Sequence, residues 1–158
     1  MKLEAELLKA SAGLADGRSY KTLTRYDADV LDAFYRSLGV EERRVRFGAA
    51  VSDESIARYC EGVDWRSTLV IACGTGRDLC AVATNARIDI RRVENATIAN
   101  RKGEDSIPTL LRLSAVAARD LFAADRMLVN LDGAREWRHH LKDLGSAALR
   151  EEYAEVDV

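Results

Sequence analysis

Cysteine and histidine side chains are the first candidates for metal binding or nucleophilic chemistry. Cys73 and Cys80 flank the segment GTGR and could face each other across a β-hairpin, whereas His139 and His140 are adjacent. Adjacent residues on a helix point about 100° apart, and a structural zinc site needs four ligands. We therefore expect buried thiols and no metal. We interpret GTGRD as a turn, because a phosphate loop needs a third glycine and a following helix.

A phosphate site could form where the segment RKGEDSIP precedes the longest helical pattern of the chain. Unpaired N–H groups at a helix N-terminus bind anions, and Arg101 and Lys102 would attract them. Two acidic residues in the same turn would repel a phosphate, and Pro108, the single proline, lacks an N–H group. The alternative is a well-started helix, with Ser106 as its cap and the proline in its first turn.

The composition is that of one water-soluble domain. The chain has 158 residues, of which 47% are hydrophobic and 32% charged, and it contains three cysteines. This length suits one domain with a real core, and the sparse cysteines indicate a reducing compartment. A formal net charge of −2 argues against a basic nucleic-acid-binding surface. Because neither an export signal nor an apolar run of about eighteen residues occurs, we expect a cytoplasmic protein that does not bind membranes.

The hydrophobic pattern predicts an N-terminal helical arm over residues 1–18 and one domain over residues 19–158. Leu3, Leu7 and Leu8 share a face of the arm, which could dock on the domain itself or on a partner chain. Within the domain, strand and helix patterns are separated by turn residues. The predicted strands cover residues 19–26, 67–73, 78–90, 91–99, 126–131 and 152–158, and the predicted helices cover residues 27–39, 41–47, 52–62, 106–122 and 133–145.

This order predicts an α+β fold with a mixed, mostly antiparallel central sheet flanked by helices and an N-terminal helical extension. The strands between residues 67 and 99 form an antiparallel meander because short turns join them. The helix over residues 106–122 then leads to the next strand as a β-α-β unit. No internal repeat or low-complexity linker divides the chain, so we expect a single domain.

The element order and the stretch YDADVLDAFYRSLGVEERRVRFGAAVSDESIARY, residues 26–59, resemble the Gcn5-related N-acetyltransferase (GNAT) superfamily. Members of this superfamily often open with a strand, a helix of this kind and a second helix rich in Arg and Phe. The resemblance covers residues 19–158 and implies a GNAT-like fold. It also implies transfer of an acetyl or other acyl group from acyl-CoA to an amine, with acetyl-CoA as co-substrate and no metal.

The acetyl-CoA signature of the superfamily is a strand, a loop of the form Gln/Arg-x-x-Gly-x-Gly/Ala, and a helix whose N-terminus receives the pyrophosphate. Here the signature falls on residues 103–108 and is degenerate. Gly103 stands in place of Gln or Arg, Ser106 in place of the first Gly, and Pro108 in place of the second. The resemblance implies that these residues bind the co-substrate: Ile98, Asn100, Arg101, Gly103, Glu104, Asp105 and Ser106.

Superfamily members often use a Glu or Asp on the fourth or fifth strand as general base and a Tyr on the last helix as acid. The resemblance implies Glu94 as the base, whereas Leu141 stands where the Tyr is usual. His140, beside it, could substitute as an acid or base. Two alternatives stay open. Glu94 could pair with Arg91 or Arg92 across the strands, and His140 could lie at a helix surface.

Three functions fit the sequence. The first is a GNAT-like N-acyltransferase that acts on a small-molecule or peptide amine. The second is a catalytically inactive GNAT-fold protein that acts as a binding or regulatory module, for which a homodimer is one candidate state. The third is an unrelated α+β binding domain. The layout favours the first function, and the degenerate signature together with Leu141 favours the second.

Overall fold

The computed structural model describes residues 2–130, 141, 147–149 and 153–158. The helices are α1 (Lys2–Ala12), α2 (Ala28–Ser37), α3 (Val40–Phe47), α4 (Asp53–Glu61) and α5 (Ile107–Asp120), and the short 3-10 helices η1 (Arg25–Asp27) and η2 (Glu104–Ser106) precede α2 and α5. The strands are β1 (Ser19–Leu23), β2 (Thr68–Thr75), β3 (Asp78–Arg87), β4 (Arg92–Ala99), β5 (Arg126–Asn130), β6 (Ala147–Leu149) and β7 (Tyr153–Asp157).

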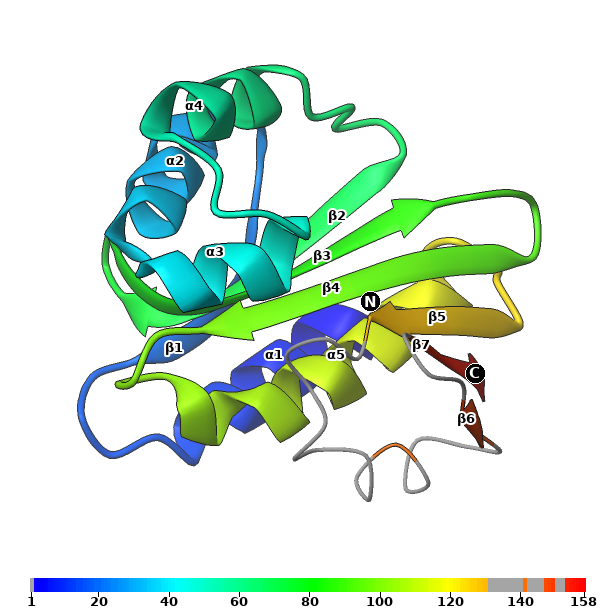
Figure 1. Ribbon diagram of the computed structural model, residues 1–158. Coiled ribbons are helices and arrows are strands. Elements are labelled where there is room, and N and C mark those ends of the chain that lie inside the picture. Colours follow the sequence, from blue (N-terminus) through cyan, green and yellow to red (C-terminus); the bar gives the residue numbers. More distant parts are fainter. Residues whose placement is uncertain (1, 131–140, 142–146, 150–152) are drawn as a thin grey trace.

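One seven-stranded sheet lies between two layers of helices, with strand order β1-β2-β3-β4-β5-β7-β6. α2, α3 and α4 cover one face, and α1 and α5 cover the other (Figure 1). All neighbouring strands are antiparallel except β4 and β5, which are parallel because α5 carries the chain back between them. The predicted α+β class, with a mixed and mostly antiparallel sheet, is confirmed.

The helices of the α2–α4 layer have ends that their sequences define. α4 begins after Ser52, whose hydroxyl accepts a hydrogen bond from the N–H group of Ser55 at 3.2 Å. α3 ends at Gly48, whose left-handed φ of 77° favours glycine. Asp27 stands at the N-cap position of α2, but its side chain makes no capping hydrogen bond to this helix. Its carboxylate instead accepts the N–H group of Thr24 at 2.8 Å and closes η1.

The β2–β3 hairpin confirms that GTGRD forms a turn. Gly76, between the two strands, has a left-handed φ of 57°. A β-bulge lies between Cys73 and Gly74, where a Cβ atom on Gly74 would be 2.3 Å from the carbonyl oxygen of Asp78. The extra residue of the bulge brings Cys80 into the same buried cluster as Cys73.

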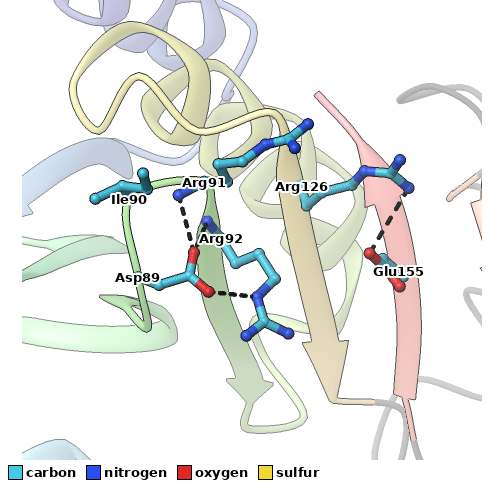
Figure 2. A pocket seen from close by; sticks show the side chains of 6 residues that line it. All are labelled: Asp89, Ile90, Arg91, Arg92, Arg126 and Glu155. Atoms are coloured by element: carbon cyan, nitrogen blue, oxygen red, sulfur yellow. Dashed lines mark hydrogen bonds and ion pairs between the residues drawn. The ribbon is translucent and has the colours of Figure 1, made fainter.

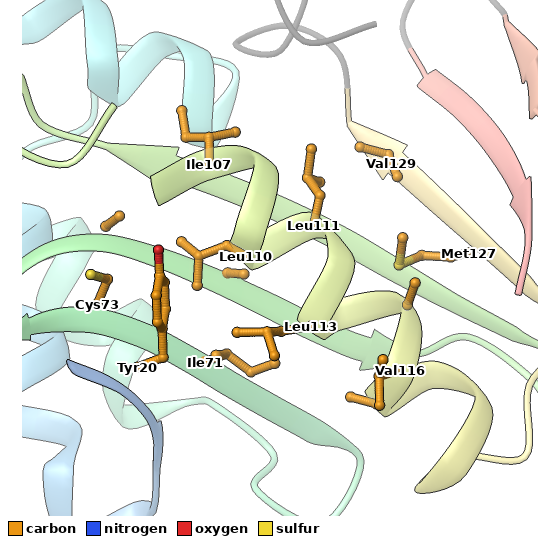
Figure 3. Close-up of a cluster of buried hydrophobic side chains, with 14 of the residues drawn as sticks. Tyr20, Ile71, Cys73, Ile107, Leu110, Leu111, Leu113, Val116, Met127 and Val129 are labelled. Carbon is orange, nitrogen blue, oxygen red and sulfur yellow. The ribbon is translucent and has the colours of Figure 1, made fainter. Parts of the chain in front are cut away.

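The larger hydrophobic cluster lies between α5 and the sheet (Figure 3). Leu110, Leu111 and Leu113 of α5 are fully buried there, and Ala117 lets the helix lie close to the strands. Burying one leucine side chain contributes about 1.5–3 kcal/mol. This packing holds the start of α5 beside the end of β4.

The N-terminal helix α1 packs on β1 and α5 of the same chain. Leu3 and Leu7 are buried in the larger cluster, and Glu6 pairs with Arg112 of α5 at 2.7 Å. Leu8, the third leucine of the predicted apolar face, is 74% exposed. The arm therefore contacts its own chain through two of its three leucines.

Replacing Leu3 with alanine should lower the free energy of unfolding by about 2 kcal/mol, because the change leaves a cavity beside α5. Leu8→Ala is the matched control, since it removes the same atoms from a largely exposed side chain and should change stability by less than about 0.5 kcal/mol. Urea denaturation of both variants measures the difference. Equal stabilities would show that the arm adds nothing to the core.

The C-terminal third agrees with the predicted strands where it is described. The predicted strands 126–131 and 152–158 are confirmed as β5 and β7, whereas β6, only three residues long, was not predicted. The predicted helix 133–145 lies outside the described residues except for Leu141, which is buried. Among the helices that the structure describes, none has the length and apolar character needed to span a membrane.

Candidate functional site

β4 and β5 separate before β4 ends. Their pairing stops at Asn95 and Val129, and β5 ends one residue later at Asn130, whereas β4 continues to Ala99 (Figure 1). The β5-facing edge of residues 96–99 therefore has no partner strand in the part of the chain that the structure describes. Main-chain N–H and C=O groups at such an edge can bind an extended ligand as an added strand.

β4 places Glu94 and Ile98 on the face of the sheet that α2, α3 and α4 cover. Ile98 is buried in the cluster beneath those helices, whereas Glu94 is exposed. Arg91 and Arg92, the expected alternative partners of Glu94, form salt bridges with aspartates instead. Within the described residues, the carboxylate of Glu94 has no ion-pair partner and is accessible to a ligand.

The turn after β4 lies directly against β3. The N–H group of Asn100 donates to the carbonyl oxygen of Cys80 at 2.9 Å, and its Oδ1 accepts the N–H group of Lys102 at 3.0 Å. A Cβ atom on Gly103 would lie 2.2 Å from the same Cys80 oxygen. Packing against β3 therefore requires the glycine, independently of any phosphate.

The start of α5 is stabilised by main-chain hydrogen bonds. The N–H groups of Gly103, Ser106 and Ile107 donate to carbonyl oxygens within the turn. The predicted side-chain cap by Ser106 was wrong, because its backbone is already helical and its buried hydroxyl lies 3.4 Å from Sγ of Cys73. Pro108 occupies the first turn of α5, as predicted, where its missing N–H group costs little.

Arg18, in the segment before β1, neutralises one of the two acidic side chains of this turn. Its guanidinium donates to both carboxylate oxygens of Asp105 at 3.1 Å and to the carbonyl oxygen of Lys102 at 3.3 Å. The hydrogen bonds from Arg18 hold the pKa of Asp105 below its ordinary range. Sequence reasoning missed Arg18, which is 87 residues from Asp105. Glu104, the other acidic residue, stays exposed.

Two hollows, of about 280 and 380 Å³, flank the turn after β4. Asp78, Cys80 and Lys102 border both hollows, Arg101 borders the smaller one, and Arg18 borders the larger one. Acidic side chains line the hollows as well, Glu42 the smaller one and Asp16 the larger one, so that cations and carboxylates are equal in number in each. An anionic group of an extended ligand on the open edge of β4 could pair with Arg18, Arg101 or Lys102 there.

A larger hollow of about 500 Å³ lies at the other end of β4, where the β3–β4 turn meets the start of β5 (Figure 2). There Arg92 pairs with Asp89 at 2.7 Å, and Arg126 lies 3.6 Å from Glu155. Three arginines and two acidic side chains line this hollow, and none of the sequence-predicted site residues that the structure describes lies there. Its size therefore does not make it the candidate site.

Cys73 and Cys80, beneath the turn that follows β4, are free and buried thiols, as predicted. The Cys80 thiol lies 3.4 Å from the carbonyl oxygen of Cys73. Hydrogen bonding with the Cys73 thiol and with Arg18 lowers the pKa of Cys80 below its ordinary value. The contact with Cys80, together with burial, raises the pKa of Cys73. Cys80 is therefore the more acidic thiol of the pair.

At neutral pH, iodoacetamide should modify Cys80 before Cys60. A lowered pKa gives Cys80 more thiolate, the reactive form, whereas burial raises the pKa of Cys60 to about 12. Arg18→Met should slow the reaction of Cys80 and move its rate profile to higher pH, because a donor to the thiolate is lost. Mass spectrometry of the digested protein measures both rates, and equal rates for the two cysteines would contradict this expectation.

Arg46 of α3 lies in an aromatic cage. Its guanidinium carbon is 5.2, 4.7 and 5.1 Å from the ring centroids of Tyr35, Phe47 and Tyr59. It donates hydrogen bonds to the Tyr59 hydroxyl at 2.6 Å and to Oγ1 of Thr84 at 3.1 Å. Its buried Nε–H group makes no hydrogen bond of ordinary geometry with any residue that the structure describes. The sequence showed only a helix rich in Arg and Phe at this position.

His140, the sequence-predicted acid or base, lies outside the described residues. Leu141, next to it, is fully buried. Across residues 2–130 and the described C-terminal segments, no three His, Cys, Asp or Glu side chains are grouped as a metal site. The structure thus brings the β4 residues and the turn together and leaves the position of the acid untested.

Neither a protein-family model nor a curated protein matches the chain, but solved structures do. The GNAT domain of S. lividans PAT superposes with a TM-score of 0.68 at 19% identity, over 89% of this chain and 90% of that chain. Spermidine N-acetyltransferase from Vibrio cholerae, in complex with CoA and spermine, gives 0.60 at 10% identity, over 89% and 94%. A GNAT-family acetyltransferase from Bacillus anthracis gives 0.57 at 8% identity, over 90% and 93%. The chain has the fold of the Gcn5-related N-acetyltransferases.

Proposed function

We propose that the protein is an N-acyltransferase that moves an acetyl or other acyl group from acyl-CoA to an amine. The observation that carries this proposal is the separation of β4 from β5, which leaves an open main-chain edge over residues 96–99. An extended pantetheine arm would pair with this edge, and the thioester would lie between the two strands. The fold shared with acetyltransferases, one of them solved with CoA, supports the proposal.

In the turn at the end of β4, cationic side chains would contribute more to binding a pyrophosphate than main-chain N–H groups. The N–H groups of Arg101 and Glu104 have no acceptor among the described residues and would be free to donate. Arg18, Arg101 and Lys102 supply positive charge, although Arg18 also pairs with Asp16 and Asp105, and Asp78 and Glu104 oppose an anion. Binding that depends on exposed side-chain charge weakens as salt is added.

Glu94 is the group that we assign to remove the proton of the amine. The amine nitrogen attacks the carbonyl carbon of the thioester, so that a C–N bond forms and the C–S bond breaks. The amine proton passes to the carboxylate of Glu94, directly or through water, and the CoA thiolate leaves and takes up a proton. His140 is the candidate donor of that proton, because Leu141 has no proton to give.

A catalytically inactive fold relative is the second candidate. Leu141, at the position where the superfamily often has its Tyr acid, is buried and apolar. In addition, the N–H groups of Gly103, Ser106 and Ile107 are used within the protein, so the turn offers fewer donors than a glycine-rich loop. Such a protein would bind CoA or acyl-CoA without turnover.

Thermal unfolding with and without millimolar acetyl-CoA, followed by an assay of CoA thiol release with a panel of amines, separates the candidates. A ligand at a hundred times its Kd stabilises a protein by about 2.7 kcal/mol, which for this chain length raises Tm by about 5–10 °C. A shift with thiol release supports acyl transfer, and a shift without release supports an inactive relative. No shift with acetyl-CoA, CoA or longer acyl-CoAs would exclude both.

A further inference from the structure

Arg46 carries a buried positive charge that no carboxylate of the described residues balances. Arg43 and Arg44 on the same helix form salt bridges with Asp53 and Glu41. Arg46 instead contacts the faces of three aromatic rings and two neutral hydroxyl groups. Aromatic faces offset part of the cost of burying a cation, but they leave its net charge available to an anion.

The cage also contains two buried polar groups whose hydrogen bonding is incomplete. Among the described residues, neither the Nε–H group of Arg46 nor the hydroxyl of Tyr35 makes a hydrogen bond of ordinary geometry, although the two side chains interact with each other. Burial raises the pKa of Tyr35, so its hydroxyl stays protonated and remains a donor. Folded proteins rarely leave buried donors unpaired, and each such group calls for an explanation. Unpaired donors beside an unbalanced positive charge are suited to a carboxylate.

The cage borders the place where β4 and β5 separate. A narrow hollow of about 10 Å³ is lined by Arg46, Ala96, Thr97 and Asn130. This volume has room for about one oxygen-sized group. Glu94 lies two residues before Ala96, on the same face of β4. A carboxylate held by Arg46 would therefore lie beside the open edge, close to the assigned base.

We propose that Arg46 binds a carboxylate group of one of the two reactants at the point of transfer. This specificity rests on acyl transfer being the function. The carboxylate belongs either to the amine acceptor, as in an amino acid, or to the far end of a dicarboxylic acyl chain on CoA. A polyamine is a poor acceptor beside Arg46, because a positive charge opposes its ammonium groups.

An NMR titration of the Arg46 Nε–H resonance with sodium acetate tests anion binding without CoA. The resonance that is missing from the spectrum of the Arg46→Lys variant belongs to the Nε–H group of Arg46. Acetate should shift this resonance saturably, whereas sodium chloride at the same ionic strength should not, and the Nε–H resonance of Arg44 should stay in place. An Arg46 resonance that acetate does not move overturns the proposal, whatever the outcome with acyl-CoA.

Paired substrates then identify the source of the carboxylate. One arm compares L-leucine with L-leucinamide as acceptors of acetyl-CoA, and the other compares succinyl-CoA with butyryl-CoA on one uncharged amine. We expect a preference in kcat/KM of about 10-fold or more for the carboxylate-bearing member of one arm, the size expected for charge-assisted hydrogen bonds.

Arg46→Met should remove that preference, whereas Arg44→Met, on the same helix, should keep it. Arg46→Lys preserves the charge without the guanidinium and should retain only part of the preference if the Met variant does not fold. Equal rates within both arms, or a preference that Arg46→Met leaves intact, overturns the proposal while acyl transfer stands. Absence of transfer from every donor contradicts the proposed function alone, and the acetate titration then decides the role of Arg46.

Discussion

Replacing Gly103 with alanine is expected to lower the free energy of unfolding by about 3 kcal/mol and to weaken acetyl-CoA binding at least tenfold. The added Cβ atom would lie 2.2 Å from the carbonyl oxygen of Cys80 and 2.6 Å from its carbonyl carbon. Overpacking costs about 1–3 kcal/mol, and a clash with main chain in the middle of a sheet falls at the upper end. The turn would have to move off β3, which breaks the hydrogen bond from Asn100 to Cys80.

Gly13→Ala is the matched control for this substitution. A Cβ atom on Gly13 would meet its nearest neighbour, the carbonyl oxygen of Ala10, at 3.5 Å, which is an ordinary contact. Its stability should stay within about 0.5 kcal/mol of the original protein. Urea denaturation and an acetyl-CoA titration measure both variants. A Gly103→Ala protein with unchanged stability and affinity would show that the turn does not depend on its contact with β3.

Glu94→Gln is expected to lower kcat about 100-fold or more, with little effect on the KM for acetyl-CoA. A general base contributes about 10²–10⁴-fold to the rate, and an amide of nearly the same shape cannot accept the amine proton. The side chain of Glu94 is exposed and makes no ion pair within the described residues, so its loss should not disturb the fold. Steady-state kinetics with a fixed amine measure the change.

Glu61→Gln, at the exposed end of α4, controls for the loss of one negative charge elsewhere on the surface. We expect this variant to keep the kcat and KM of the original protein. A Glu94→Gln protein with full turnover would show that Glu94 is not the general base. A water molecule or another carboxylate would then have to accept the proton of the amine.

The arrangement of strands and helices was predictable where the signal is local. The hairpin at GTGRD, the end of α3 at Gly48 and the parallel pairing across α5 follow from turn residues and hydrophobic period. Side-chain roles at element ends were less predictable. Asp27 and Ser106 both have the chemistry of a helix cap, but Asp27 bonds locally to Thr24 in the turn before α2, and a tertiary contact directs Ser106 to Cys73.

The candidate site was predictable only in part. The resemblance located β4 and the turn that follows it, because these residues are contiguous in the sequence. Arg18 and Arg46 were not found, since their contacts with Asp105 and Thr84 span 87 and 38 residues and exist only in the folded sheet. The open edge of β4 was equally hidden, because it depends on where β5 ends relative to β4.

Amide hydrogen exchange of residues 96–99, resolved by NMR with and without saturating acetyl-CoA, tests most directly whether the open edge of β4 binds the co-substrate. We predict that N–H groups on the β5-facing edge, together with those of Arg101 and Glu104, exchange more slowly when acetyl-CoA is bound. The amides around Asp89, at the far hollow, should exchange at unchanged rates. Bound acetyl-CoA that leaves residues 96–99 unprotected, or that protects the Asp89 region instead, would contradict this site.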